Sequence, residues 1–96
     1  MSPRKLRIGV AGLGRAFSFM LPTFVLDERI ELVAGADPRA EARDRFAVDF
    51  GAKTYAEVEA LCADPDVEVV YISPPHQHHM PNALAGVRNG KHVLVE

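Results

Sequence analysis

The sequence predicts an α/β domain built on a doubly wound parallel sheet. Short apolar segments of strand length alternate with segments of helical spacing, and glycine or proline stands at most of the junctions between them. Several strand segments are apolar throughout, which is typical of parallel strands covered by helices on both faces. A chain of 96 residues suffices for one domain. We expect residues 1–96 to form that domain without a linker or repeat.

Strands are predicted at five places in the chain. Apart from 53–55, these segments are short, apolar and bounded by turn residues. The segment at 67–73 shows the clearest pattern, whereas 53–55 is long enough only for a short edge strand. The predicted strands cover residues 6–11, 30–36, 53–55, 67–73 and 92–96.

Helices are predicted in the four intervals between these strands. The first interval contains Pro22, which removes a backbone hydrogen bond and should kink or divide the helix. Asp37 and Pro38 favour the start of the second helix, because Asp is a preferred N-cap and Pro suits the first helical position. Gly51 is a good residue to end that helix. The predicted helices cover residues 15–27, 38–50, 56–63 and 77–89.

A doubly wound sheet places these strands in the spatial order 3-2-1-4-5. A sixth strand would lie beside residues 92–96, and it is missing from the sequence. Residues 92–96 should therefore form an open sheet edge, and such edges recruit other chains. We expect the isolated chain to be marginally stable and to self-associate.

Composition and charge exclude several classes of protein. The formal net charge of −2 lacks the basic excess that nucleic-acid binding requires. No apolar run reaches the length of about 18 residues that a membrane span needs, and the first residues do not resemble a secretory signal. The single cysteine, Cys62, cannot form an internal disulfide and should pack in a helix. We expect a cytoplasmic protein that binds neither nucleic acid nor membrane.

The junction of the first strand and first helix carries a functional signal. Dinucleotide-binding folds need glycine there, because the turn is tight and the backbone must approach a pyrophosphate closely. We expect Gly12, Gly14, Arg15 and Ala16 to hold a pyrophosphate through backbone amides. Phe17 occupies the place of the third small residue of this pattern, so a generic strand-to-helix turn is the alternative.

An acid follows the second predicted strand. Asp37 follows Gly14 by about 20 residues, which is the usual spacing between the glycine turn and the acid of dinucleotide-binding folds. In those folds the acid accepts hydrogen bonds from the adenosine ribose. Its charge also repels a 2′-phosphate. The alternative is that Asp37 only caps the next helix. Arg39 could instead pair with that phosphate, so we expect NAD as the cofactor, with NADP less favoured.

Histidines gather in the loop after the fourth predicted strand. This loop lies at the carboxyl ends of the strands, where open α/β sheets bind ligands, so we interpret it as the wall beside the nicotinamide. Surface histidines at a helix start are the alternative. We expect no metal site, because a four-ligand site needs convergent partners and Cys62 lies on another predicted helix. The loop residues proposed for the cofactor are Ser73, Pro75, His76 and His79.

Three motifs together resemble the glucose–fructose oxidoreductase and inositol dehydrogenase family over essentially the whole chain. The first is the glycine turn followed by an acid. In the loop Ser73-Pro74-Pro75-His76-Gln77-His78-His79, Pro75 and His79 match the family's Thr-Pro-Asn-x-x-His pattern, and His76 replaces Asn. The last strand is similar to the family's strand that ends in Glu-Lys-Pro. Met20-Leu21-Pro22 and the histidine-rich loop look most like the phthalate dihydrodiol dehydrogenase branch.

The resemblance implies an oxidoreductase that transfers a hydride between a nicotinamide dinucleotide and a hydroxyl or dihydrodiol carbon of a small molecule. It places Glu96 at the nicotinamide end of the cofactor. In the family, a lysine after that glutamate acts on the substrate, and a second domain supplies the other catalytic groups and often the oligomer interface. We therefore expect a fragment of a homo-oligomeric enzyme that is inactive alone and carries no catalytic residue.

A non-catalytic nucleotide sensor or assembly module is the rival to the enzyme, because a fold alone does not determine function. The phenylalanines are expected in the core. A solvated acidic face is expected from Glu57, Glu59, Asp64, Asp66 and Glu68.

Overall fold

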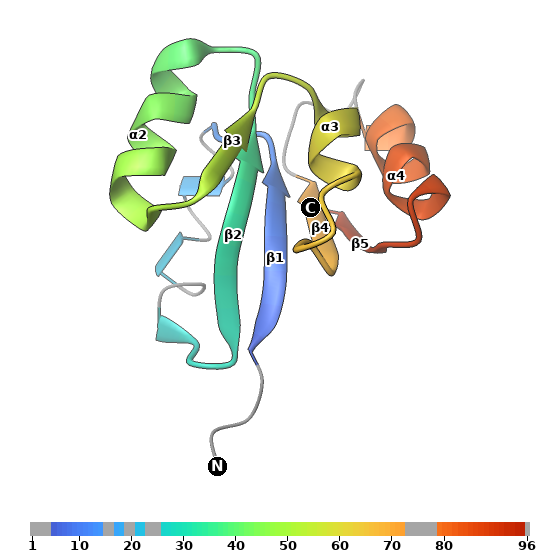
Figure 1. Ribbon diagram of the computed structural model, residues 1–96, viewed down its shortest axis with the longest axis horizontal. Coiled ribbons are helices and arrows are strands. Elements are labelled where there is room, and N and C mark those ends of the chain that lie inside the picture. Colours follow the sequence, from blue (N-terminus) through green and yellow to red (C-terminus); the bar gives the residue numbers. More distant parts are fainter. Residues whose placement is uncertain (1–4, 15–16, 19–20, 23–25, 73–78, 96) are drawn as a thin grey trace.

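A parallel sheet forms the centre of the molecule (Figure 1). The computed structural model describes residues 5–14, 17–18, 21–22, 26–72 and 79–95, of which 79–83 and 95 are described by their backbone alone. In this part of the chain the strands pair in parallel in the order β3-β2-β1-β4-β5. The predicted fold class and strand order are thus confirmed. The strands are β1 (Leu6–Ala11), β2 (Ile30–Ala36), β3 (Lys53–Tyr55), β4 (Val69–Ile72) and β5 (His92–Val95).

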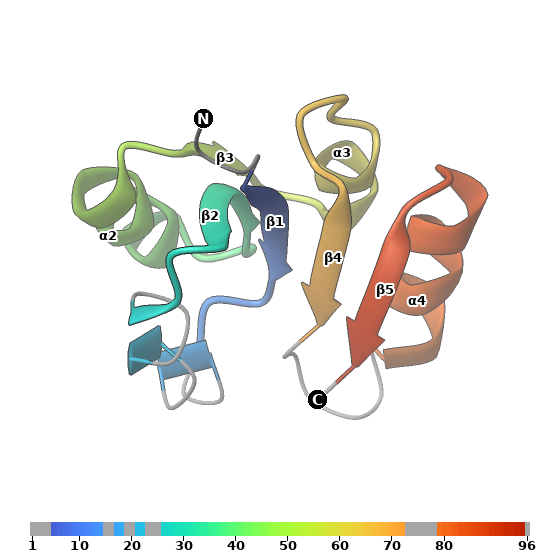
Figure 2. The ribbon, with the colours of Figure 1, turned by 90° about the horizontal axis from the view of Figure 1, so that it is seen from below.

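Helices cover both faces of this sheet (Figure 2). Helices α3 (Val58–Cys62) and α4 (His79–Arg88) lie on one face. Helix α2 (Ala40–Phe50) lies on the other face, together with the helical residues of the 17–26 segment that the structure describes. Because a parallel connection must cross over the sheet, this alternation of faces buries both sides of the central strands.

Each face of the sheet has its own apolar cluster. Under α3 and α4 the cluster is made of small and β-branched side chains from the strands, with Leu61 and Cys62 from α3 and Ala85 from α4. Under α2 it contains Phe17 and Phe46 together with strand residues. Cys62 is a free, fully buried thiol, which confirms that it packs in the core. Burial of the thiol raises its pKa.

The second helix begins later than the sequence predicts. Its first residue is Ala40, and Arg39 stands at the N-cap position without a side-chain cap. Asp37 is not the N-cap, because its carboxylate is bonded to the amide of Leu13 and to Arg39. The predicted end is confirmed: Gly51 has a φ of 61° and donates its N–H to the Ala47 carbonyl.

Asp64 is buried and does not belong to a solvated acidic face, so that prediction is wrong for this residue. Its carboxylate accepts hydrogen bonds from Tyr55 Oη at 2.8 Å and from the Asp66 amide at 2.8 Å, and it lies 2.7 Å from Lys53 Nζ. Its backbone carbonyl accepts a bond from Lys91 Nζ at 2.8 Å. These contacts hold the turn between α3 and β4 at the amino ends of the strands, opposite the glycine turn.

Candidate dinucleotide site

The glycine turn begins directly where β1 ends. Gly12 has a φ of 99°, a conformation that side chains rarely adopt. Its N–H donates to the Ala36 carbonyl at 2.8 Å, which ties the carboxyl end of β1 to that of β2. The predicted need for glycine at this position is thus explained by the backbone of the turn.

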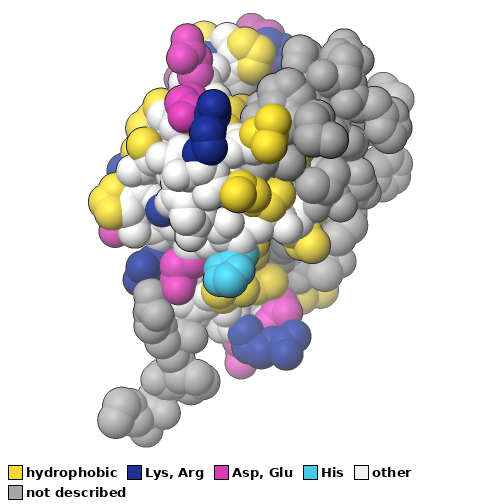
Figure 3. Space-filling model, turned by 90° about the vertical axis from the view of Figure 1, so that its right-hand side faces the viewer, with side chains coloured by type: hydrophobic (Ala, Val, Ile, Leu, Met, Phe, Trp, Pro, Cys, Tyr) yellow, Lys and Arg dark blue, Asp and Glu magenta, His cyan; other side chains and the backbone are white. Residues whose placement is uncertain are grey.

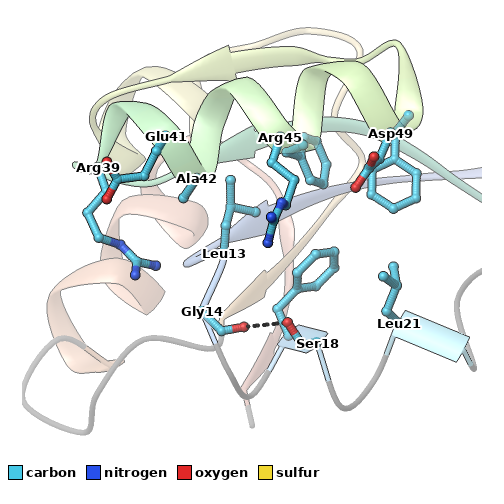
Figure 4. A pocket seen from close by; sticks show the side chains of 12 residues that line it. Leu13, Gly14, Ser18, Leu21, Arg39, Glu41, Ala42, Arg45 and Asp49 are labelled. Atoms are coloured by element: carbon cyan, nitrogen blue, oxygen red, sulfur yellow. Dashed lines mark hydrogen bonds between the residues drawn. The ribbon is translucent and has the colours of Figure 1, made fainter.

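Helical hydrogen bonding starts at Gly14. The Gly14 carbonyl accepts a bond from the Ser18 amide at 3.1 Å and another from Ser18 Oγ at 3.2 Å (Figure 4). Among the described residues, a Cβ placed on Gly14 would meet Arg39 Nη2 alone within 4 Å, at a distance of 3.6 Å. The turn therefore leads straight into the start of a helix, and backbone amides at such a start can bind a phosphate.

Asp37 lies directly beside the glycine turn. It follows β2, is 5% exposed, and accepts a hydrogen bond from the Leu13 amide at Oδ2, at 3.0 Å. Its own amide donates to the Tyr55 carbonyl at 3.1 Å, which fixes the backbone against β3. The predicted acid and the predicted turn are thus brought together at one place, the carboxyl ends of β1 and β2.

Arg39 forms a two-pronged ion pair with this acid. Its Nε donates to Asp37 Oδ1 at 3.0 Å and its Nη2 donates to Oδ2 at 3.1 Å, while its backbone amide donates to Oδ1 at 2.9 Å. Burial alone would raise the pKa of the Asp37 carboxyl, but the bonds from Arg39 and from the Leu13 amide outweigh it and lower the pKa below its ordinary value. Asp37 is therefore ionised at neutral pH.

Arg43 also supports this turn, although the sequence analysis did not identify it. Its Nη1 donates to the carbonyls of Asp37 and Pro38 at 2.8 and 3.0 Å. These carbonyls precede α2, so Arg43 fixes the path of the chain between the acid and the helix. The sequence signal that could have identified Arg43 is its position about one helical turn after the Asp-Pro pair.

A cavity of about 420 Å³ separates the glycine turn from α2 (Figure 4). Gly14 and Arg39 line one end of it, and aromatic rings line its apolar side. The ring centroids of Phe17 and Phe46 are 5.9 Å apart, and both side chains are buried. Phe17, which stands where the glycine pattern usually has its third small residue, is therefore a core side chain, as expected. The Arg45 side chain extends from α2 into this space.

Comparison with known proteins decides the family. A model described as "Oxidoreductase family, NAD-binding Rossmann fold" (GFO_IDH_MocA) matches residues 6–96. The chain belongs to this family. The resemblance drawn from the glycine turn, the histidine loop and the last strand is thus confirmed, and so is its expected NAD(P)-binding oxidoreductase domain.

Individual family members agree with this assignment. The chain is 51% identical over 92 residues to 1-carboxy-3-chloro-3,4-dihydroxycyclohexa-1,5-diene dehydrogenase of Comamonas testosteroni, covering 95% of this chain and 23% of that protein. It is 40% identical over 75 residues to D-xylose 1-dehydrogenase (NADP(+)) of Hypocrea jecorina, covering 73% of this chain and 19% of that protein. The dihydrodiol type of the first relative confirms the branch that the sequence suggested.

A solved structure of the family shows the same fold. Biliverdin reductase from Synechocystis, in complex with biliverdin and NADP+, superposes with a TM-score of 0.83 at 31% identity, covering 94% of this chain and 28% of that chain. The chain therefore spans less than a third of the length of each of these family members.

The described residues fit the family's cofactor. The φ of Gly12 and the absence of a side chain at Gly14 suit the tight turn of a dinucleotide-binding fold, and the ionised Asp37 carboxylate lies beside that turn. Gly12, Gly14, Asp37 and Arg39 are thus brought together as predicted. His79 is the first residue of α4, where only the backbone is described. The other predicted site residues lie outside the described part of the chain: Arg15, Ala16, Ser73, Pro75, His76 and Glu96.

Proposed function

We propose that the intact protein is an NAD-dependent dehydrogenase that acts on a hydroxyl or dihydrodiol carbon of a small molecule. The observation that carries this proposal is the contact between Asp37 and the glycine turn through the Leu13 amide. Similarity to a dihydroxycyclohexadiene dehydrogenase supports the substrate class. The bound nicotinamide would supply the hydride chemistry, and the residues of this chain would bind and orient the cofactor.

Each part of the site has its own role in this proposal. The backbone of the glycine turn binds the pyrophosphate, and Asp37 accepts hydrogen bonds from the adenosine ribose. The loop after β4 and the end of β5 flank the nicotinamide. The pyrophosphate residues are Gly12, Gly14, Arg15 and Ala16, and the residues at the nicotinamide end are Ser73, Pro75, His76, His79 and Glu96.

The charge of Asp37 supports NAD over NADP. The carboxylate is buried and its pKa is lowered, so a negative charge stands where the ribose hydroxyls would bind. A 2′-phosphate placed there would be repelled by this charge. We therefore propose that the intact protein binds NAD more tightly than NADP.

Calorimetric titration of the intact protein with NAD and with NADP tests this proposal. NAD should bind more tightly, and Asp37→Ala should weaken NAD binding by about ten-fold or more, because a hydrogen bond to a charged group is worth about 1.5–3 kcal/mol. Asp44→Ala, an exposed acid on α2, is the matched control and should bind NAD as the unmodified protein does. Tighter binding of NADP, or an unaffected Asp37→Ala variant, would contradict the assignment.

A further inference from the structure

The Asp37 carboxylate, which we propose as the ribose ligand, already accepts as many hydrogen bonds as its two oxygens ordinarily do. An ionised carboxylate has about four lone-pair sites on its two oxygens. Oδ1 of Asp37 accepts the Arg39 amide and Arg39 Nε, and Oδ2 accepts the Leu13 amide and Arg39 Nη2. A ribose diol can therefore bind Asp37 only if one of these donors leaves.

The four donors differ in how easily they can give up their hydrogen bonds to Asp37. The amides of Leu13 and Arg39 belong to the backbone of the glycine turn and of the segment that Arg43 holds before α2. The guanidinium of Arg39 is on a long side chain that is 54% exposed, while the Asp37 side chain is 6% exposed. Because the guanidinium is half exposed, it can exchange the carboxylate for solvent, whereas the two amides are fixed by the backbone. The guanidinium is the donor that must leave.

The same guanidinium also covers the approach to the glycine turn. Its Nη2 would lie 3.6 Å from a Cβ on Gly14, so it lies over the backbone that the pyrophosphate would approach. Figure 4 shows Arg39 at the end of the cavity beside Gly14. Arg39 thus stands at both contact points proposed for the adenosine half of the cofactor.

We propose that Arg39 occupies the ribose site of the free protein and determines its cofactor specificity by two opposite effects. This inference rests on the proposed function of Asp37. Arg39 competes with the ribose of NAD for the carboxylate, and only the fraction of molecules that has released it can bind. Once released, the guanidinium stands beside the ribose and pairs with a 2′-phosphate, which offsets the repulsion from Asp37. Arg39 therefore weakens NAD binding and strengthens NADP binding.

Replacement of Arg39 should change the two affinities in opposite directions. In Arg39→Ala, NAD should bind about two- to five-fold more tightly, because loss of an exposed ion pair has an effect of this size. NADP should bind about ten-fold more weakly, since a charge-assisted hydrogen bond to its phosphate is lost. Arg39→Lys keeps the charge but lacks the two-pronged contact, so it should bind NAD more tightly while retaining more NADP affinity than Arg39→Ala.

Titration of the intact protein with NAD and NADP separates the outcomes. Arg29→Ala is the matched control, because Arg29 makes the same two-pronged pair with Asp27 before β2, away from Asp37, and its two affinities should match those of the unmodified protein. Unchanged or weaker NAD binding in Arg39→Ala, or an equal gain in Arg29→Ala, overturns this inference and leaves the proposed function intact. Absence of NAD binding in the unmodified protein would overturn the proposed function itself.

Discussion

At the scale of single residues, neighbouring glycines serve different purposes. Gly35 lies in β2 beneath α2, and a Cβ there would lie 2.8 Å from the Phe46 ring, which is itself buried among other rings. At Gly14, among the described residues, the same addition would make an ordinary contact with the long Arg39 side chain. The missing side chain at Gly35 thus serves packing, whereas the described structure gives Gly14 no comparable packing role.

This difference gives a paired prediction. Gly35→Ala should lower the free energy of unfolding by about 1–3 kcal/mol, because overpacking forces the Phe46 ring out of place. Gly14→Ala should keep the stability of the unmodified protein but bind NAD more weakly, because its methyl group stands where the pyrophosphate approaches. Urea denaturation and NAD titration of both variants check this. Unchanged NAD affinity in Gly14→Ala would show that Gly14 is not part of the binding site.

The sequence predicted which residues lie together at the proposed site better than it predicted how they interact. Gly12, Gly14 and Asp37 could be identified because the turn and the acid follow directly from strand ends, which meet at one edge of a parallel sheet. The bonds that Arg39 makes to the acid, and the support from Arg43, depend on side-chain paths that spacing does not determine. Both needed the structure.

At the scale of elements, the turn between α3 and β4 is held by a buried charge. The Asp64 side chain has no exposed area, and it is paired with Lys53, which is half exposed. Burial alone would raise the pKa of the Asp64 carboxyl, but bonds from Lys53, from the Asp66 amide and from Tyr55 lower it below its ordinary value. The folded state therefore favours the ionised carboxylate.

Asp64→Asn should lower the free energy of unfolding at pH 7 by about 1–3 kcal/mol, because the buried partners lose a charged acceptor. The pKa of Asp64 is lower in the folded state, so its contribution is fully present above the unfolded value of about 3.9 and is lost as the pH falls further. The stabilities of the variant and the unmodified protein should thus begin to converge as the pH falls below about 4, and become equal only below the lowered pKa of the folded state. Urea denaturation across pH measures this.

The exposed acid of the same turn provides the control. Asp66 pairs with Lys53 at 3.0 Å from a side chain that is 62% exposed, so Asp66→Asn should change the stability by less than about 1 kcal/mol. Equal losses in the Asp64 and Asp66 variants would show that burial does not matter at this turn.

Strands were predicted more accurately than helix boundaries. Strands β1 and β2 have the predicted bounds, because central strands covered on both faces leave an apolar signal in the sequence. The short edge strand β3 also has its predicted bounds, whereas β4 begins at Val69 and not at residue 67 as predicted. The start of α2 was wrong because the carboxylate of Asp37 has partners outside the helix, in Leu13 and Arg39. Similarly, Asp64 was assigned to a solvated face because its burial depends on Lys53, which is distant in sequence.

At the scale of the whole molecule, apolar side chains of helix α4 and strand β5 are exposed. Leu84 and Val87 on α4 and Leu94 on β5 are 52%, 65% and 52% exposed. Figure 3 shows hydrophobic side chains gathered on the side of the molecule where these elements lie. Strand β5 is also the outermost strand next to β4.

Among the described residues, no helix is long and apolar enough to cross a membrane.

The 96-residue polypeptide prepared alone should self-associate, because exposed apolar side chains and an unpaired strand edge both recruit other chains. Sedimentation at several protein concentrations should show a mass that rises with concentration. Leu94→Lys should reduce this association, since an edge charge opposes pairing between copies. A monomer at all concentrations, with slow amide exchange in β5, would show that the edge is protected in another way.

The central claim is that the carboxyl ends of β1 and β2 bind the adenosine half of a nicotinamide dinucleotide. Hydrogen exchange of the intact protein with and without NAD tests it most directly, because protection by a ligand is measured segment by segment. We predict slower exchange over residues 12–14 and 37–39 on addition of NAD, with no change in the turn at 64–68, at the opposite end of the sheet. Protection elsewhere with none at 12–14 and 37–39 would contradict the assignment of this site.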